Sequence, residues 1–333
     1  MPGPSPFDEM TNADGSVREP YLILDQWLKE QPPQALGLMA ADAEAIFRRL
    51  GITFAVYGSN EGAEKLIPFD IIPRIVSAIE WRKLSKGIEQ RVRALNAFLH
   101  DIYHRQEILK AGRVPEKLIL NNSAFCPEMM GLDPARGIYS HIIGVDLVRV
   151  GPDDWYVLED NLRTPSGVSY MLEDREAMLQ LAPDLFQRLK VAAVETYPEN
   201  LRRTLESVAP AGAGSSPTLA VLTPGIHNSA YFEHSFLADQ MGAELCEGQD
   251  LFVENGKVYA RTTMGPRRID VIYRRIDDDF MDPTAFREDS LLGVPGLLDA
   301  YRAGKVALAN APVRARPGLS KPRRARAAAT VPT

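Results

Sequence analysis

The sequence predicts an α/β protein of the α+β type, and three observations carry this prediction. Apolar residues recur at helical spacing through the first part of the chain. A pair of strands with a tight turn follows near the middle. Beyond residue 218, short apolar strands and a helix alternate in the order of a small doubly wound sheet. A chain of 333 residues, 45% apolar and 25% charged, has enough core for two or more domains.

The first part of the chain is mainly helical by the spacing of its apolar residues. Helices are expected at 21–29 and 40–50, and a short strand at 52–57. Pro73 is well placed to open the next helix. Residues 74–110 then predict one or two long amphipathic helices. Their apolar stripe consists of Leu95, Phe98, Leu99 and Ile102.

Two histidines of this helical segment, His100 and His104, have an i,i+4 spacing that places both side chains on one helix face. Such a pair can hold a metal, but no Glu lies between them in the pattern of a metalloprotease. We expect a surface pair.

The central stretch YSHIIGVDLVRVGPDDWYVLEDNLRTPSGVSY predicts two strands joined by a turn. The turn at 151–154 has Pro and Asp in its central positions, as hairpin turns do. If Val150 pairs with Trp155, the antiparallel register places Asp146 opposite Glu159. Two carboxylates directly across a sheet repel each other, and a cation between them removes the repulsion.

The remaining residues of the second strand support a metal site. Val157, Glu159 and Asn161 fall on one face because side chains alternate along a strand, and Gly144 lies opposite Asn161. Mg²⁺ suits such oxygen ligands and leaves its other positions to water and phosphate oxygens. Asp160 points to the opposite face and is not expected to be a ligand.

The alternative is a strand that runs into a solvated loop, because Asp and Asn favour turns. Taken singly, each of the three polar residues is more often a surface residue than a ligand. Their shared register and face favour the metal site. A bulge in either strand would change this register.

The segment after the hairpin is again helical over 176–197, and the helix continues at 201–208. Residues 210–217, PAGAGSSP, are rich in Gly, Ser and Pro and predict an interdomain linker. A short buried strand is expected at 218–222.

The C-terminal part has the pattern of a small α/β domain. A helix is expected to begin near Asn228 or Ser229 and to end at Gly242. An Asn-Gly turn at 255–256 predicts a hairpin, and a buried strand follows at 270–275.

Ligands of such a domain bind at the carboxyl ends of its strands. These ends are residues 223–228 and the pair Arg274 and Arg275. The arginines are placed to clamp a carboxylate or a phosphate. Alternatively, one or both form ion pairs with the acidic residues 277–279.

The charge of the chain is unevenly distributed. The net charge is −6, but residues 312–333 contain six of the 38 basic residues and no acidic residue, which leaves −12 on the rest. The acidic body argues against nucleic acid as its main partner. The tail has no periodicity and is expected to be disordered. It is either a basic arm for RNA, DNA or a membrane, or the product of a shifted reading frame, which we favour.

Targeting features are absent from the sequence. No apolar run is long enough to span a bilayer, and the N-terminus MPGPSPFDEM lacks the regions of a signal peptide. Cys126 and Cys246 are too few for a disulfide framework or a closed zinc site. We expect a cytoplasmic protein without a membrane partner.

The spacing of Asp146, Glu159 and Asn161, with Arg163 after them, resembles the magnesium motif of ATP-grasp ligases. The early position of this motif, before the α/β segment, is similar to the circularly permuted ATP-grasp proteins of type 2 and to the synthetase domain of glutathionylspermidine synthetase. The resemblance covers roughly residues 7–311. It is carried by PFDIIPRI, VLEDNLRTPSGVSY, NSAYFEHSFLADQMGAEL, DVIYRRIDDDFMDP and LGVPGLLDAYRAGKVALANA.

This resemblance implies an ATP-dependent ligase that joins a small-molecule or peptide carboxylate to an amine through an acyl phosphate. Asp146, Glu159 and Asn161 would hold Mg²⁺ at the phosphates of ATP. Cofactor binding would involve Arg163, Ser166 and Gly167. Arg163 and Arg274 would be catalytic residues, with Arg274 and Tyr231 as substrate contacts.

The resemblance also implies a division of the chain. Residues 1–209 form a helical region plus the magnesium-binding lobe, 210–217 the linker, and 218–311 a Rossmann-like pre-ATP-grasp domain. The basic tail, 312–333, replaces the lobe that clamps the nucleotide in the family. We therefore expect an impaired ligase. The alternatives are a catalytically dead truncated homologue, and a non-enzymatic protein that acts through a protein partner or as a homo-oligomer.

Overall fold

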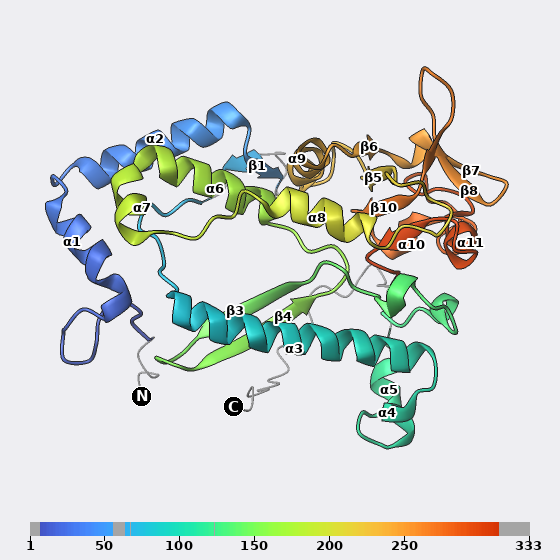
Figure 1. The fold of residues 1–333 in the computed structure, drawn as a ribbon, viewed down its shortest axis with the longest axis horizontal. Coiled ribbons are helices and arrows are strands. Elements are labelled where there is room, and N and C mark those ends of the chain that lie inside the picture. Colours follow the sequence, from blue (N-terminus) through green and yellow to red (C-terminus); the bar gives the residue numbers. More distant parts are fainter. Residues whose placement is uncertain (1–6, 56–63, 67, 123, 313–333) are drawn as a thin grey trace.

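The computed structural model describes residues 7–55, 64–66, 68–122 and 124–312 of the chain (Figure 1). Helices and strands are mixed along the described residues, so the predicted α+β class is confirmed. Of the predicted basic tail, only Pro312 belongs to the described part.

The N-terminal region is helical, as predicted. Its α-helices are α1 (Leu22–Glu30), α2 (Ala35–Leu50), α3 (Ala78–Tyr103), α4 (Glu107–Lys110) and α5 (Glu116–Ile119). Short 3-10 helices are η1 (Glu19–Tyr21), η2 (Pro127–Met129) and η3 (Ala135–Gly137). The second helix starts five residues before its expected position, because Ala35–Met39 already favours a helix.

Two N-terminal predictions need correction. The strand expected at 52–57 is β1 (Thr53–Ala55), which pairs antiparallel with β2 (Glu64–Leu66); residues 56 and 57 lie outside the described part. Pro73 does not open a helix. Helix α3 begins at Ala78 because Ser77 and Glu80 form a capping box that satisfies free N–H groups of its first turn.

The helical segment after the central hairpin is divided into three helices, so the continuous helix predicted over 176–197 is wrong. These are α6 (Val168–Leu181), α7 (Pro183–Leu189) and α8 (Tyr197–Glu206). Pro183 lacks an N–H group and occupies the first turn of a new helix. Helix α7 then packs against α1, where the Trp27 indole donates a hydrogen bond to Asp184.

The C-terminal part is built on a four-stranded parallel sheet with the order β11-β10-β5-β6. Its strands are β5 (Leu219–Leu222), β6 (Glu244–Cys246), β10 (Val271–Arg274) and β11 (Ala307–Ala309). Both faces of the sheet are buried, as the nearly continuous apolar runs predict. Ala220 and Leu222 point into one hydrophobic cluster, and Leu219 and Val221 point into a second cluster on the other face.

Further elements surround this sheet. They are α9 (Tyr231–Met241), α10 (Asp278–Met281), α11 (Leu297–Arg302), η4 (Gly248–Asp250), and the antiparallel strands β7 (Leu251–Glu254), β8 (Lys257–Ala260) and β9 (Arg267–Ile269). The turn between β7 and β8 is the predicted Asn-Gly turn, with φ of 51° at Asn255 and 70° at Gly256. Helix α9 ends at Gly242 as predicted. It starts later than Asn228 or Ser229, and the Asn228 side chain instead accepts a hydrogen bond from the Ala230 N–H.

The predicted linker, 210–217, connects α8 to β5. Leu201, Leu205 and Val208 from the α8 segment belong to the same hydrophobic cluster as α9 and one face of the parallel sheet. The linker therefore joins a helix to the sheet on which that helix packs. The division of the chain into domains at residues 210–217 stays a prediction.

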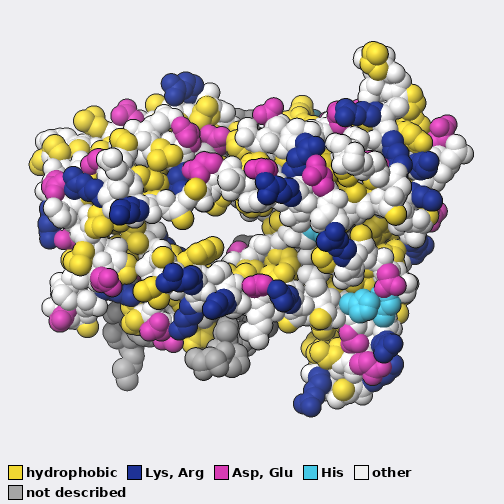
Figure 2. All heavy atoms as spheres, in the orientation of Figure 1, with side chains coloured by type: hydrophobic (Ala, Val, Ile, Leu, Met, Phe, Trp, Pro, Cys, Tyr) yellow, Lys and Arg dark blue, Asp and Glu magenta, His cyan; other side chains and the backbone are white. Residues whose placement is uncertain are grey.

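In Figure 1, α2, α6 and α8 lie above the central hairpin of the chain, and α3 runs below it. The space-filling view shows an opening between these upper and lower parts (Figure 2). Strands β5, β6 and β10 of the parallel sheet lie at the upper right of Figure 1, beyond α8.

Candidate metal and substrate site

The central hairpin consists of β3 (Gly144–Arg149) and β4 (Trp155–Asn161). Its antiparallel register pairs Asp146 with Glu159 and Gly144 with Asn161, as the sequence predicts. The two carboxylates and the amide therefore occupy neighbouring positions on the strands. This is the geometric core of the candidate metal site.

The register near the turn differs from the prediction by one residue. Trp155 pairs with Arg149 and not with Val150, and a bulge at Leu158 restores the predicted pairing at the carboxylates. Val157 consequently pairs with Leu147 and lies on the face opposite Glu159, which corrects the predicted face. Leu158 is the extra residue, and its side chain is 71% exposed.

The three polar side chains of the site are exposed and interact with one another. The Asn161 amide nitrogen donates to Glu159 Oε1 over 3.2 Å. Partial burial and the neighbouring Glu159 carboxylate raise the pKa of Asp146. Two carboxylates held in repulsion beside an amide oxygen form a donor set that fits a hard cation such as Mg²⁺.

The opposite face of the hairpin is fixed to α3. Arg91 of α3 donates from Nε and Nη2 to the two oxygens of Asp160, over 2.8 and 2.6 Å. Near the turn, the buried Arg149 donates to Glu80, a residue of the α3 capping box. These contacts hold the hairpin in place and engage the Asp160 carboxylate with Arg91.

Arg163 lies just after the hairpin and reaches toward the C-terminal part. Its Nη1 is 3.3 Å from Asp277 Oδ1, and its side chain is 35% exposed. Its backbone carbonyl accepts from the buried side chain of Asn310, which follows β11. The structure thus joins the end of the hairpin to the edge of the parallel sheet.

Ser166 and Gly167 lie at the start of α6, in contact with a buried ion pair. Glu233 of α9 accepts from the Gly167 and Ser169 N–H groups over 2.7 and 3.2 Å. Arg275 Nη2 donates to Glu233 over 2.8 Å and to the Ser166 hydroxyl over 2.7 Å. The N–H group of Gly167, a residue expected to take part in cofactor binding, is therefore occupied by a carboxylate of the protein itself.

A pocket of about 290 Å³ lies beside this ion pair, at the carboxyl ends of β5 and β10. Its polar lining comes from three segments and includes Thr164, Ser166, Asn228, His234, Arg275 and Asp277. The Arg275 Nε is buried and has no hydrogen-bond partner among the described residues. The positive charge of Arg275 and the polar side chains of this lining allow the pocket to accept an anionic or hydrogen-bonding group of a ligand.

Arg274 lies away from this pocket and is completely buried. Its guanidinium donates to the carbonyls of Asn310, Ile276 and Ala311, and it forms an ion pair with Asp278 over 2.8 Å. The alternative interpretation, pairing with the acidic cluster, describes Arg274, whereas Arg275 lines the pocket. Tyr231, the other predicted substrate contact, is the first residue of α9.

His234 is neutral in its buried position. The Thr223 hydroxyl is 2.8 Å from His234 Nδ1 and also accepts from the Gly225 N–H over 3.2 Å. Burial, aided by the positive charge of Arg275, lowers the pKa of His234 to about 3.

The buried His234 predicts acid lability. An unfolded histidine takes up a proton below about pH 6.5, whereas the folded one does so only near pH 3, so the free energy of unfolding falls as the pH drops below 6.5. Between pH 6 and 4, the free energy of unfolding should fall less steeply in the His234→Gln variant than in the wild type. We expect the difference in slope to reach up to about 1.4 kcal/mol per pH unit. Urea unfolding across this range measures it. Equal slopes in the wild type and in His234→Gln would contradict the prediction.

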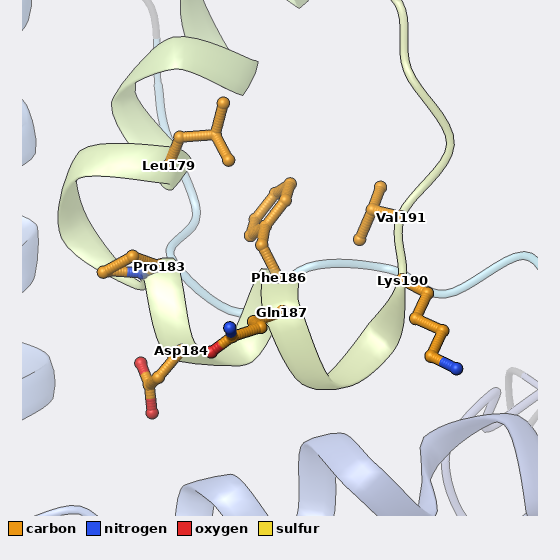
Figure 3. A pocket seen from close by; sticks show the side chains of 7 residues that line it. All are labelled: Leu179, Pro183, Asp184, Phe186, Gln187, Lys190 and Val191. Atoms are coloured by element: carbon orange, nitrogen blue, oxygen red, sulfur yellow. The ribbon is translucent and has the colours of Figure 1, made fainter.

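A second hollow, of about 710 Å³, lies over α6 and α7 and contains none of the predicted site residues. Figure 3 shows that Leu179, Phe186 and Val191 face one another, whereas Asp184 and Lys190 point outward. Its lining lacks the convergent polar groups of a catalytic site, so we assign it no chemistry.

Sequence reasoning missed Glu233, His234 and Asn310. Asn310 left a signal, because a polar residue in the apolar stretch ALANA must be hydrogen-bonded when buried. Glu233 and His234 resemble ordinary polar residues of an exposed helix turn. Their position after a strand end is the only hint that the sequence offers.

Comparison with known proteins places this architecture in a family. The sequence model for circularly permuted ATP-grasp proteins of type 2 matches residues 73–315. The chain belongs to this family, and the predicted resemblance is confirmed.

None of the helices in the described residues has the length and apolar composition to cross a bilayer.

Several curated proteins are similar over nearly the whole chain. An uncharacterized protein of Synechocystis is 51% identical over 92% of this chain and 63% of its own length. An uncharacterized protein of Mycobacterium tuberculosis is 48% identical over 92% of this chain and 54% of its own length. A putative glutamate–cysteine ligase of Frankia alni is 40% identical over 93% of this chain and 36% of its own length. The chain thus spans between about a third and two thirds of these relatives.

Among solved structures, a glutathione synthetase-like effector from Globodera pallida aligns with 85% of this chain and 63% of its own chain. The TM-score is 0.45 and the sequence identity is 13%.

Proposed function

We propose that this chain carries the metal-binding and acid-binding parts of an ATP-dependent carboxylate–amine ligase. The observation that carries the proposal is the pairing of Asp146 with Glu159, beside Asn161, in a member of the ATP-grasp family. The Frankia relative is a putative glutamate–cysteine ligase, which supports a reaction between a carboxylate and an amine.

Asp146, Glu159 and Asn161 would hold Mg²⁺ through oxygen atoms. When bound, Mg²⁺ neutralises the charge of the ATP phosphates during phosphoryl transfer. Arg163 follows Asn161 by two residues and would add a positive charge near the metal ligands; its side chain is 35% exposed and pairs with Asp277 and, more distantly, with Asp278. Ser166 would orient the substrate from the rim of the pocket, where Arg275 fixes its hydroxyl.

The acid would bind in the pocket lined by Arg275, whose positive charge favours a carboxylate. In the proposed reaction, a carboxylate oxygen of the acid attacks the γ-phosphorus of ATP and ADP leaves. The amine nitrogen then attacks the carbonyl carbon of the acyl phosphate, phosphate leaves, and the nitrogen loses a proton. Small-molecule or peptide acids and amines are the substrate class.

Calorimetric titration of ATP with Mg²⁺ tests this function. We expect the Glu159→Gln variant to bind the nucleotide at least about tenfold more weakly than the wild type, a loss of about 1.4 kcal/mol, because one charged metal ligand is removed. Glu254→Gln, an exposed carboxylate at the β7 end, is the matched control and should bind like the wild type.

The outcomes separate the alternatives. Nucleotide binding that is equal in the wild type and in Glu159→Gln would contradict the metal role of the hairpin. Mg²⁺ binding without ATP binding would favour an inactive homologue that keeps a metal site. A partner recovered in stoichiometric amounts without ATP would favour an interaction protein.

A further inference from the structure

We propose that His100, His104 and Asp133 form a separate site for a first-row transition metal ion such as Zn²⁺. One ligand atom from each residue lies within 4.8 Å of the others. The three residues lie at the carboxyl end of α3, where Figure 2 shows a histidine patch on the molecular surface. This proposal is independent of the proposed ligase function.

The local structure explains how the three side chains meet. The i,i+4 spacing stacks the rings of His100 and His104, with their centroids 4.2 Å apart and an interplanar angle of 27°. Asp133 comes from the loop after η2. This loop is fastened to the end of α3 because the Gly131 N–H donates to the Tyr103 carbonyl over 2.8 Å. The site therefore rests on a helix and on a loop tied to that helix.

Hydrogen bonding fixes the tautomer of His104. Its Nδ1 is 2.9 Å from the His100 carbonyl, which only accepts. The Tyr139 hydroxyl lies 3.4 Å from Nδ1 and gives its proton to the Leu132 carbonyl, so it too can only accept from the ring. Nδ1 therefore carries a proton. A metal-binding histidine typically donates its second ring nitrogen to a carbonyl in this way.

The other ring nitrogen then faces a carboxylate. His104 Nε2 is 3.0 Å from Asp133 Oδ1, is buried from solvent, and has no hydrogen-bond partner among the described residues. A lone pair and a carboxylate oxygen at this distance repel each other unless a cation joins them. Either a metal ion or a second ring proton fills that role.

The donor set selects the class of metal. Two imidazoles and one carboxylate suit Zn²⁺, Cu²⁺ or Fe²⁺, whereas Mg²⁺ prefers the oxygen ligands of the hairpin. His100 is exposed and the Asp133 side chain is 75% exposed, so further positions are open to water or another ligand. Binding would fasten α3 to the loop that leads through Tyr139 into β3.

Zinc titration of the metal-stripped full chain, in competition with a chromophoric chelator, tests the proposal. We expect one Zn²⁺ per chain at this site, and at least about tenfold weaker binding in His100→Ala and in Asp133→Asn. The exposed His227→Ala variant is the control and should bind like the wild type. Melting curves with and without Zn²⁺ check that the variants fold, because His100 and Asp133 lie on the surface.

The magnetic resonance spectrum of bound Cu²⁺ provides a second readout, since imidazole nitrogens split its lines and carboxylates do not. The nitrogen splitting should persist in Asp146→Asn and weaken in His100→Ala. Zinc affinity that is unchanged in His100→Ala and Asp133→Asn would overturn the proposal. The absence of zinc binding would overturn it as well.

Discussion

Replacing Asn310 by Asp is expected to lower the free energy of unfolding by about 4–6 kcal/mol at neutral pH. The Asn310 side chain is completely buried. Its Nδ2 donates to the carbonyls of Ile142, Leu162 and Arg163 over 2.6, 2.7 and 3.0 Å. Its Oδ1 accepts from the His141 and Ile142 N–H groups. Aspartate keeps the acceptor but turns a charged oxygen toward the three carbonyls.

The pH dependence of this variant tests the cause of the loss. Repulsion from the carbonyls raises the folded pKa of the new carboxyl group, so the folded state binds a proton more tightly than the unfolded state. The defect relative to the wild type should therefore be largest at neutral pH and shrink as the pH falls through the folded pKa. Urea unfolding at pH 7 and pH 5 measures it. The exposed Asn200→Asp variant should change stability by less than about 0.5 kcal/mol, and an equal effect at residue 310 would refute the argument.

Local patterns predicted the elements of this fold well where one rule dominated. The apolar runs of β5 and β10 and the Asn-Gly turn between β7 and β8 required no knowledge of distant residues. Helix boundaries were less predictable where two signals competed. Helix α3 starts after the capping box at Ser77 and not at Pro73. The capping box satisfies N–H groups of the first turn, whereas a proline only removes one.

The pairing of Asp146 with Glu159 was predicted correctly although the assumed turn register was wrong. The assumed pairing of Val150 with Trp155 is off by one residue, and the bulge at Leu158 shifts the register back before Asp146 and Glu159. Neither a turn type nor a bulge follows reliably from alternation alone. The facing carboxylates therefore depended on two offsets that cancel.

The interior polar contacts were beyond the reach of sequence patterns. Glu233 meets Gly167 from 66 residues away, and Asn310 meets Ile142 from 168 residues away. A buried polar group is stable only when the fold brings it suitable partners, and nothing in the neighbouring sequence specifies those partners. The same holds for Asp133, which only the fold places beside His104.

Removal of the Glu233 carboxylate is expected to destabilise the chain by about 3–5 kcal/mol, because it leaves a buried charge without its partner. The Glu233 and Arg275 side chains are each about 1% exposed. The same carboxylate accepts from the Gly167 N–H and from the N–H and hydroxyl of Ser169, so Glu233→Ala also strands donors at the start of α6. Glu233→Gln should recover part of the loss. Its single carbonyl oxygen can accept either from Arg275 or from the donors at the start of α6, but not from both.

A double-mutant cycle separates the ion pair from the loss of packing. Arg275→Met alone should also destabilise, since it strands the carboxylate. In the variant with both Glu233→Ala and Arg275→Met, neither charge is left buried alone. Its loss in free energy of unfolding should therefore be at least about 1 kcal/mol smaller than the sum of the losses in the two single variants. Glu206→Ala, which breaks the more exposed pair with Arg202, should cost less than about 1 kcal/mol. Strict additivity at Glu233 and Arg275 would show that the two charges are not coupled, and that the buried pair does not hold α6 to the parallel sheet.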